Sequence, residues 1–307
     1  MPSLPIVPKR KIWYIFSGLL AGVSILAIIF FGFRYGLDFT GGSLLEISYN
    51  NSRPANEVMT RLLAEEGVHN ATLQPSGEKG FIIRLAELSE ETHQALVAKL
   101  QEHATGNDAG DAMTEERFES FGPSLGSELK RYALYAILMV LLAIILFLAY
   151  SFRKVSRPVA SWKFGTVAVI ALAHDVLITL GLFSVLGYLY GTEVNGFFVT
   201  ALLTLMGFSV HDTIVTLDRV RENLIIHQEL TFSDLVNLSI NQTLTRSIIT
   251  SLTTVLTLVA IFIFGGASVR DFTLALIFGI IIGTYSSIFV ASPLLVTWNL
   301  IVKKYQK

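Results

Sequence analysis

An acidic residue interrupts one of the long apolar stretches of this sequence. Asp212 lies within residues 196–217, a mainly apolar run of the length that crosses a lipid bilayer. A charged side chain at the middle of a membrane helix costs about 2.5–3.5 kcal/mol on insertion scales, so such a residue usually has a function. Arg246 stands at the start of a second apolar run, residues 248–264. An acid and a base on neighbouring membrane helices indicate a proton-handling site.

Only Asp212 can carry the proton, since arginine stays charged at physiological pH. At 1.5 Å per residue, Asp212 lies roughly 24 Å from Gly196 and Arg246 roughly 28 Å from Gly265, so the two can meet at a similar depth. Burial disfavours a charged carboxylate and a nearby guanidinium favours it, so moving Arg246 would change the proton affinity of Asp212. Two other interpretations stay open: Arg246 is a topological anchor, or Asp212 is a structural partner that never titrates.

Other polar residues near this pair form a predicted secondary network. Thr216 shares a helical stripe with Asp212, and Thr250 follows Arg246 on one face of the next run. Their hydroxyls indicate a hydrated path, although small residues also simply allow helices to pack. The network is predicted to contain Asp175, His211, Thr216 and Thr250.

The repeated His-Asp pair, His174-Asp175 and His211-Asp212, raises the question of a metal site. Adjacent helical residues point about 100° apart, so one pair does not face one ion easily, and the apolar neighbours supply no groups to orient ligands. We predict no metal and no cofactor. Asp175 is either a network member or a structural hydrogen-bonding acid. His211 either tunes the proton carrier or fills space.

The elements that must position these residues are membrane helices. The chain has 307 residues, of which 52% are hydrophobic and only 15% charged, against about 25% charged in soluble domains. Six runs are long enough to span a bilayer. They cover residues 12–33, 132–152, 164–190, 196–217, 248–264 and 272–302.

Basic residues predict the orientation of these spans. Thirteen fall in the loops and tails on one side, against Arg270 alone in the two short loops opposite. By the positive-inside rule both termini are cytoplasmic and residues 34–131 form an external, periplasmic domain. The predicted organisation is therefore a tail and first helix (1–33), the external domain (34–131), five further helices (132–302) with a cytoplasmic loop at 218–245 along the membrane surface, and a tail (303–307). The thirteen are Lys9, Arg10, Lys11, Arg153, Lys154, Arg157, Lys163, Arg219, Arg221, Arg246, Lys303, Lys304 and Lys307.

The external segment has the shorter rhythms of a water-soluble fold. Strands are predicted at 44–49, 71–74, 81–85 and 117–121, with helices at 54–66 and 89–103. This β-α-β-β-α-β order predicts an α+β, ferredoxin-like domain. The segment carries 16 acidic and 9 basic residues, and the chain as a whole shows no basic surface for nucleic acid.

A glycine-rich segment joins the first predicted span to this domain. The sequence Gly36-Leu37-Asp38-Phe39-Thr40-Gly41-Gly42 contains paired glycines, which permit positive φ and a sharp turn from helix to sheet. An anion-binding loop is the alternative, but the Gly-x-Gly-x-x-Gly spacing and a following helix are lacking. We interpret the segment as a junction.

Several motifs spread over the whole chain resemble the SecF family. They are GLDFTGG (36–42), FGPSLG (121–126), HDTIVTLDRVREN (211–223), QTLTR (242–246) and GTYSSIF (283–289). SecF is the smaller subunit of the SecDF protein-export complex, which is related to resistance-nodulation-division (RND) transporters. One position departs from the family, which usually has Asn before the intramembrane Asp, where this chain has His211.

This resemblance implies a non-enzymatic subunit of the inner (cytoplasmic) membrane that pairs with SecD. It implies association with the SecYEG channel, with YajC as a further partner, and use of the proton motive force to promote movement of unfolded secretory proteins. Two other functions stay open. An RND-type efflux subunit would normally have larger external domains and twice as many spans, and a structural assembly factor would be indifferent to loss of the proton gradient.

Overall fold

A computed structural model describes residues 4–51, 53–68, 71–107, 112–153 and 161–305, and it divides into two compact units, Tyr35–Tyr132 and the remainder of the chain. Among the described residues, six helical segments are long and apolar enough to cross a membrane. They are α1 (Arg10–Phe31), α5 (Pro123–Ser151), α6 (Ser161–Tyr190), α7 (Gly196–Ile226), α8 (Phe232–Phe264) and a last span made of α9 (Ala267–Ser286), a π-helical turn (Ser287–Ala291) and α10 (Ser292–Tyr305).

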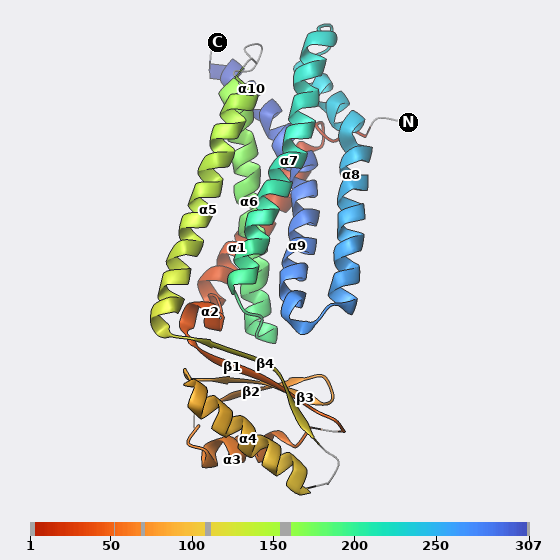
Figure 1. Ribbon diagram of the computed structural model, residues 1–307. Coiled ribbons are helices and arrows are strands. Elements are labelled where there is room, and N and C mark those ends of the chain that lie inside the picture. The colour runs from red at the N-terminus through yellow and green to blue at the C-terminus, as the bar shows by residue number, and fades with distance from the viewer. Residues whose placement is uncertain (1–3, 52, 69–70, 108–111, 154–160, 306–307) are drawn as a thin grey trace. The chain divides into compact units, whose positions relative to one another are not determined.

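The predicted six-span architecture is thus confirmed. The segment before α1 and helix α10 lie toward the same end of the bundle, as an even number of spans requires (Figure 1). Three of the basic residues used to orient the chain, Lys154, Arg157 and Lys307, lie outside the described residues.

The segment predicted as a cytoplasmic loop, residues 218–245, is mostly helical in the structure. Helix α7 continues to Ile226, and α8 begins at Phe232 with the Thr231 side chain accepting a bond from the Asp234 amide. Thr231 therefore caps the start of α8. Since residues 232–264 contain neither Gly nor Pro, nothing ends this helix before the membrane span, and it continues into the span without a break.

The extended ends of α7 and α8 pack against each other. With 31 and 33 residues, the two helices are roughly 46 and 50 Å long, well beyond the thickness of about 30 Å of the hydrocarbon core. Asn223 Nδ2 of α7 donates to Ser239 Oγ and to Gln242 Oε1 of α8, each at 2.8 Å. These bonds hold the pair together beyond the apolar part of each helix.

Glycine residues bring α9 close to α7 in the centre of the bundle. Gly279 and Gly283 are one turn apart on α9. A Cβ added to Gly279 would lie 2.7 Å from Leu205 Cδ1 of α7, and one added to Gly283 would lie 3.2 Å from Ser209 Cβ of α7. Small residues at four-residue spacing let membrane helices approach closely, which favours van der Waals packing and hydrogen bonds between them. This close contact sets the geometry of the polar site described below.

The Tyr35–Tyr132 unit is the predicted ferredoxin-like domain, and that fold is confirmed. Its elements are β1 (Gly42–Tyr49), α3 (Asn56–Glu65), β2 (Thr72–Ser76), β3 (Gly80–Leu85), α4 (Glu90–Asn107) and β4 (Met113–Phe121), with a short helix α2 (Leu37–Thr40) before them. The sheet order is β2-β3-β1-β4 with antiparallel neighbours, and α3 and α4 lie on one face (Figure 1).

Alternation along the two central strands creates the core of this domain. Leu45 pairs with Ile83 and Ile47 with Phe81 across β1 and β3, and all four side chains are fully buried. Apolar residues of α3 and α4 close the same core, which is why the period-two pattern of the strands predicted the buried face correctly.

The glycine-rich segment forms a tight junction between α2 and β1. Gly41 and Gly42 have φ values of 75° and 121°, and a Cβ on Gly42 would lie 2.7 Å from the Leu85 carbonyl oxygen. Gly126, near the start of α5, lies against the backbone of Phe39 and Gly41, where a Cβ would be 3.2 and 3.0 Å away. Two of the motifs noted in the sequence therefore meet backbone to backbone.

We expect the variant Gly42→Ala to destabilise the Tyr35–Tyr132 unit more than Gly77→Ala does. Both substitutions impose a positive φ on alanine, which costs about 1–3 kcal/mol, but only position 42 also collides with the Leu85 carbonyl; Gly77 has no atom within 4 Å. Hydrogen exchange of the β1 and β3 amides in the full chain measures the difference. Equal protection in the two variants would contradict the collision.

We expect Gly283→Ala to lower the thermal unfolding midpoint of the detergent-solubilised chain, by about 2–4 °C for each kcal/mol lost. The added methyl group separates α9 from α7 at Ser209. Gly207→Ala on α7 is the matched control, since nothing lies within 4 Å of it and alanine favours a helix over glycine by about 1 kcal/mol. A control that is destabilised as much as Gly283→Ala would rule out this packing argument.

Candidate proton-binding site

Asp212 is buried in the bundle and held by serine hydroxyls from two other elements. Its side chain belongs to α7 and the residue is 7% exposed. Ser247 Oγ of α8 donates to Oδ1 at 2.6 Å, and Ser287 Oγ of the π-helical turn donates to Oδ2 at 2.6 Å. Each carboxylate oxygen therefore has one neutral donor.

A second carboxylate, Asp175 of α6, has a similar environment. The residue is fully buried, and its Oδ2 accepts bonds from Ser209 Oγ of α7 at 2.6 Å and from Ser286 Oγ of α9 at 2.7 Å. His174 Nδ1 lies 2.9 Å from its Oδ1. Asp175 is thus joined to α7 and α9 by hydrogen bonds that satisfy it inside the membrane span.

Two consecutive serines connect the two acidic groups. Ser286 is the last residue of α9 and bonds Asp175, while Ser287 is the first of the π-helical turn and bonds Asp212. Neighbouring side chains on a helix point about 100° apart, so a Ser-Ser pair can reach two different helices. Single π-helical turns are rare in proteins overall, but those that occur often lie at functional sites.

The hydroxyl environment can accommodate a carboxyl group in either protonation state. An ionised carboxylate only accepts hydrogen bonds, whereas a protonated one also donates, and a serine hydroxyl can do both by rotating. Among the described residues, the only ion pair recorded at either carboxylate is the one between His174 and Asp175. The site therefore suits a group that gains and loses a proton without rebuilding its surroundings.

The structure does not bring Arg246 and Asp212 together. Arg246 is exposed on α8, and within the described part of the chain it forms no ion pair with Asp212. The residue that reaches Asp212 is its neighbour, Ser247. Sequence reasoning paired Asp212 with Arg246 because both side chains are charged. The uncharged hydroxyl of Ser247, at the next position, gave no such signal.

The predicted secondary residues fall into two groups. Thr216 is buried, and its Oγ1 donates to the Asp212 carbonyl oxygen at 3.3 Å and lies 3.5 Å from Thr243 Oγ1. Thr250 and His211 are exposed and make no recorded bond to either carboxylate. Asp175 therefore belongs with the buried serines and Asp212, whereas Thr250 and His211 lie on the surface of this chain.

Sequence reasoning missed the four serines that bind the two acids: Ser209, Ser247, Ser286 and Ser287. A usable signal did exist, since a hydroxyl within an apolar span must find a partner on its own helix or a neighbouring one. The same reasoning applies to Ser251 and Thr284, which hydrogen-bond each other between α8 and α9.

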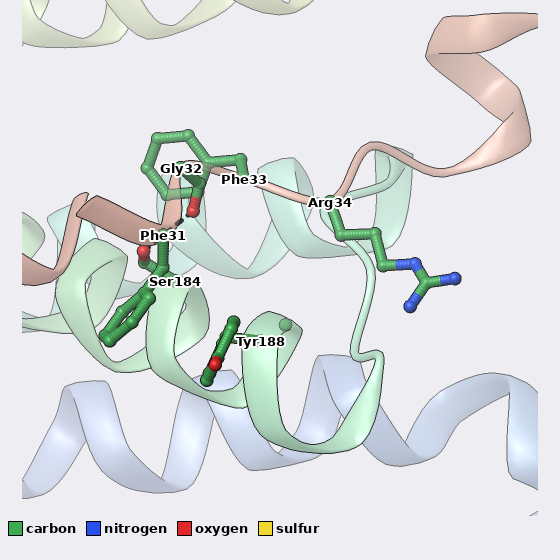
Figure 2. Close-up of a pocket in the computed structure, with 7 residues that line it drawn as sticks. Phe31, Gly32, Phe33, Arg34, Ser184 and Tyr188 are labelled. Carbon is green, nitrogen blue, oxygen red and sulfur yellow. Dashed lines mark hydrogen bonds between the residues drawn. The ribbon is translucent and has the colours of Figure 1, made fainter. Parts of the chain in front are cut away.

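The bundle also contains a cavity of about 340 Å³ away from these carboxylates. It lies between the end of α1, residues 31–34, and Ser184, Gly187 and Tyr188 of α6 (Figure 2). The Phe31 ring stacks on Tyr188 with centroids 4.5 Å apart, and Ser184 Oγ donates to the Gly32 carbonyl at 2.7 Å. No acidic residue lines it, so it is not part of the candidate site.

Known proteins resemble this chain over most of its length. The family described as "Protein export membrane protein SecD/SecF, C-terminal" matches residues 101–300, and "SecD/SecF GG Motif" matches residues 26–52. The protein translocase subunit SecF of Thermobaculum terrenum is 39% identical over 96% of this chain and 94% of its own length. That of Haemophilus influenzae is 36% identical, over 94% and 84% of the two chains.

A solved structure shows the same arrangement within a longer protein. The crystal structure of SecDF from Thermus thermophilus, described as a translocon-associated membrane protein, is 35% identical with a TM-score of 0.81, and the match covers 97% of this chain. The match spans only 39% of that fused protein. By the agreement of family, sequence and fold, this chain belongs to the SecD/SecF family of protein-export membrane proteins.

Proposed function

We propose that this chain is a proton-driven accessory subunit of protein export, in which Asp212 binds and releases the proton. The observation that carries the proposal is the burial of Asp212 between α7, α8 and the π-helical turn, with serine hydroxyls on both of its oxygens. A carboxylate in this position links the packing of three elements to its own protonation. It therefore gives the proton gradient a direct effect on helix packing.

Arg246 enters this cycle through rotation of α8. Ser247 faces Asp212 in the structure, and Arg246 is the preceding residue on the same helix. A rotation of α8 by about 100° around its own axis would bring Arg246 to Asp212 in place of Ser247. We propose that Arg246 pairs with ionised Asp212 in a second state, and that protonation of Asp212 returns the helix to the serine-bonded state.

The proton gradient provides enough energy for such a rearrangement. One charge crossing 100 mV of membrane potential releases about 2.3 kcal/mol, which compares with the 1–3 kcal/mol that typically couples two sites in a protein. The external domain is connected to the bundle through the segment after α1 and through α5, which starts at Pro123 directly after β4. Repacking of the spans would move that domain and the secretory chain it contacts.

The same proposal includes partners and location. A fused SecDF relative is 37% identical over 92% of this chain, which supports association with SecD. We further propose association with SecYEG and YajC, an inner-membrane location with cytoplasmic termini, and no cofactor besides the proton gradient. The basic residues clustered on one side of the predicted spans support that orientation.

We expect Asp212→Asn to abolish the stimulation of protein translocation by an imposed proton gradient, because asparagine keeps the shape of the side chain but cannot bind the proton. The measurement is the amount of secretory protein protected inside inverted membrane vesicles, with and without the gradient. Immunoblotting verifies that equal amounts of each variant are inserted.

The control for this experiment is Asp218→Asn on the same helix, which removes an exposed carboxylate that forms an ion pair with Arg221. It is expected to keep full stimulation. If Asp212→Asn also keeps full stimulation, the proton-carrier proposal fails. A chain whose contribution is unchanged after collapse of the gradient would instead be a structural assembly factor.

We expect Arg246→Lys to preserve insertion and orientation but not full stimulation. A lysine still anchors the cytoplasmic end of the helix, but it lacks the planar fork that pairs with a carboxylate through two bonds. Proteolytic accessibility of loops and the vesicle assay measure the two effects separately. Full stimulation by the lysine variant would show that Arg246 acts only as an anchor.

A further inference from the structure

We propose that Asp175 is a second proton-binding group, coupled to Asp212 through the adjacent serines Ser286 and Ser287. This inference rests on the proposed function of Asp212 and extends it from a single carboxyl group to a linked pair. The arrangement consists of one carboxylate on α6, one on α7 and a Ser-Ser pair where α9 meets the π-helical turn.

The surroundings of Asp175 are those of a carboxyl group that can change charge. It has no exposed surface, and both donors to its Oδ2 are neutral hydroxyls, Ser209 and Ser286. A buried charge without a full counter-ion is costly, and such groups respond by binding or releasing a proton. A purely structural role would be served as well by an uncharged amide.

His174 provides a route by which a proton can reach this carboxyl group. Its Nδ1 lies 2.9 Å from Asp175 Oδ1, while its Nε2 is buried and lacks a hydrogen-bond partner among the described residues. A histidine can exchange protons near neutral pH, with one nitrogen donating while the other accepts. The unpartnered Nε2 is therefore suited to accept a proton that Nδ1 passes to Asp175.

No other charged group competes for Asp175 among the described residues. On the elements packed against α6, Tyr14 of α1 hydrogen-bonds Thr297 and Tyr285 of α9 hydrogen-bonds Ser17. On α7, Ser209 donates a hydrogen bond to Asp175, and the other acidic residue, Asp212, accepts one from Ser287. Arg10 lies at the start of α1 and Lys303 near the end of α10, at the ends of their helices.

The serine pair couples the two carboxyl groups mechanically. Ser286 and Ser287 are consecutive, and Ser292 Oγ donates to the Ser287 carbonyl at 3.2 Å across the π-helical turn. If Asp212 leaves Ser287 when it loses its proton and the turn shifts, Ser286 must move relative to Asp175. The helices are closely packed at Gly283, since a Cβ added there would lie 3.2 Å from Ser209 Cβ and 3.6 Å from Asp175 Oδ2.

Infrared titration of the protonated carboxyl groups in the full chain, reconstituted in lipid vesicles, tests the coupling. The chain has 24 Asp and Glu residues, so the bands of this pair are identified as those lost in Asp175→Asn and in Asp212→Asn. In wild type the pair is expected to titrate in two steps separated by more than about one pH unit, as coupled pairs do. Asp175→Asn and Asp212→Asn should each leave one step, and if the groups are coupled the two wild-type steps should lie further apart than the two single-variant midpoints. Asp175→Asn is also expected to reduce proton-driven translocation several-fold in the vesicle assay.

A second variant keeps the test independent of the folding of Asp175→Asn. Ser286→Ala retains both carboxyl groups and removes the bond that connects the pair, so its two steps should move toward each other. Ser184→Ala is the matched control: this buried α6 serine donates to backbone carbonyls of α1 and of residue 32, outside the network, and should change neither step.

The outcomes separate this inference from the function on which it rests. A wild-type separation equal to the difference between the two single-variant midpoints, or two unshifted steps in Ser286→Ala, would overturn the coupling. Full translocation by Asp175→Asn would likewise remove Asp175 from the cycle. Full proton-driven translocation by Asp212→Asn would refute the proposed function itself.

Discussion

The hydrocarbon core of a membrane offers no hydrogen-bond partner, so every polar atom inside it must find one within the protein. Two carboxyl groups of this chain, Asp175 and Asp212, lie under that constraint, and serine hydroxyls from three membrane spans donate to them. The helices of the bundle centre must therefore lie close enough for short side chains to reach across. The positions of α7, α8 and α9 all depend on this requirement.

Glycine allows two segments of the chain to approach closely at two places in this molecule. In the bundle, Gly279 and Gly283 allow α9 to approach α7, so that Ser209 and Ser286 reach the same oxygen of Asp175. In the external unit, Gly41, Gly42 and Gly126 allow backbone segments to meet where α2 gives way to β1. In both places a side chain would occupy the volume that brings two functional segments together.

The partners of Asp212 in the structure are serine hydroxyls and not a basic residue. A permanent ion pair would fix the carboxylate in its charged form, whereas a hydroxyl can donate to the ionised group and accept from the protonated one. In the proposed cycle, the structure represents the serine-bonded state of Asp212. Arg246, one position away from Ser247, is available to stabilise a different state of the same helix.

The external domain and the spans were largely predictable from the sequence. Continuous apolar runs of about 20 residues have few alternatives to membrane helices, and the alternating strands around Leu45 and Ile83 predicted the correct buried face. The boundaries of α7 and α8 were not predictable to the same degree, because charged residues such as Arg219 and Arg246 indicated a loop where nothing actually breaks the helix. Charged residues indicate that a segment is exposed to water. They do not end a helix, because a helix that leaves the membrane keeps its backbone hydrogen bonds.

The sequence by itself determined that a carboxylate lies in a membrane span, because charge and hydropathy are properties of the chain. Which groups touch that carboxylate was decided only by the tertiary structure. Ser209, Ser247, Ser286 and Ser287 come from three membrane spans, and serine is common enough that its type alone indicates no site. The rotation of α8 brought Ser247 rather than Arg246 to Asp212. The close packing of α9 on α7 at Gly283 brought Ser209 and Ser286 to Asp175.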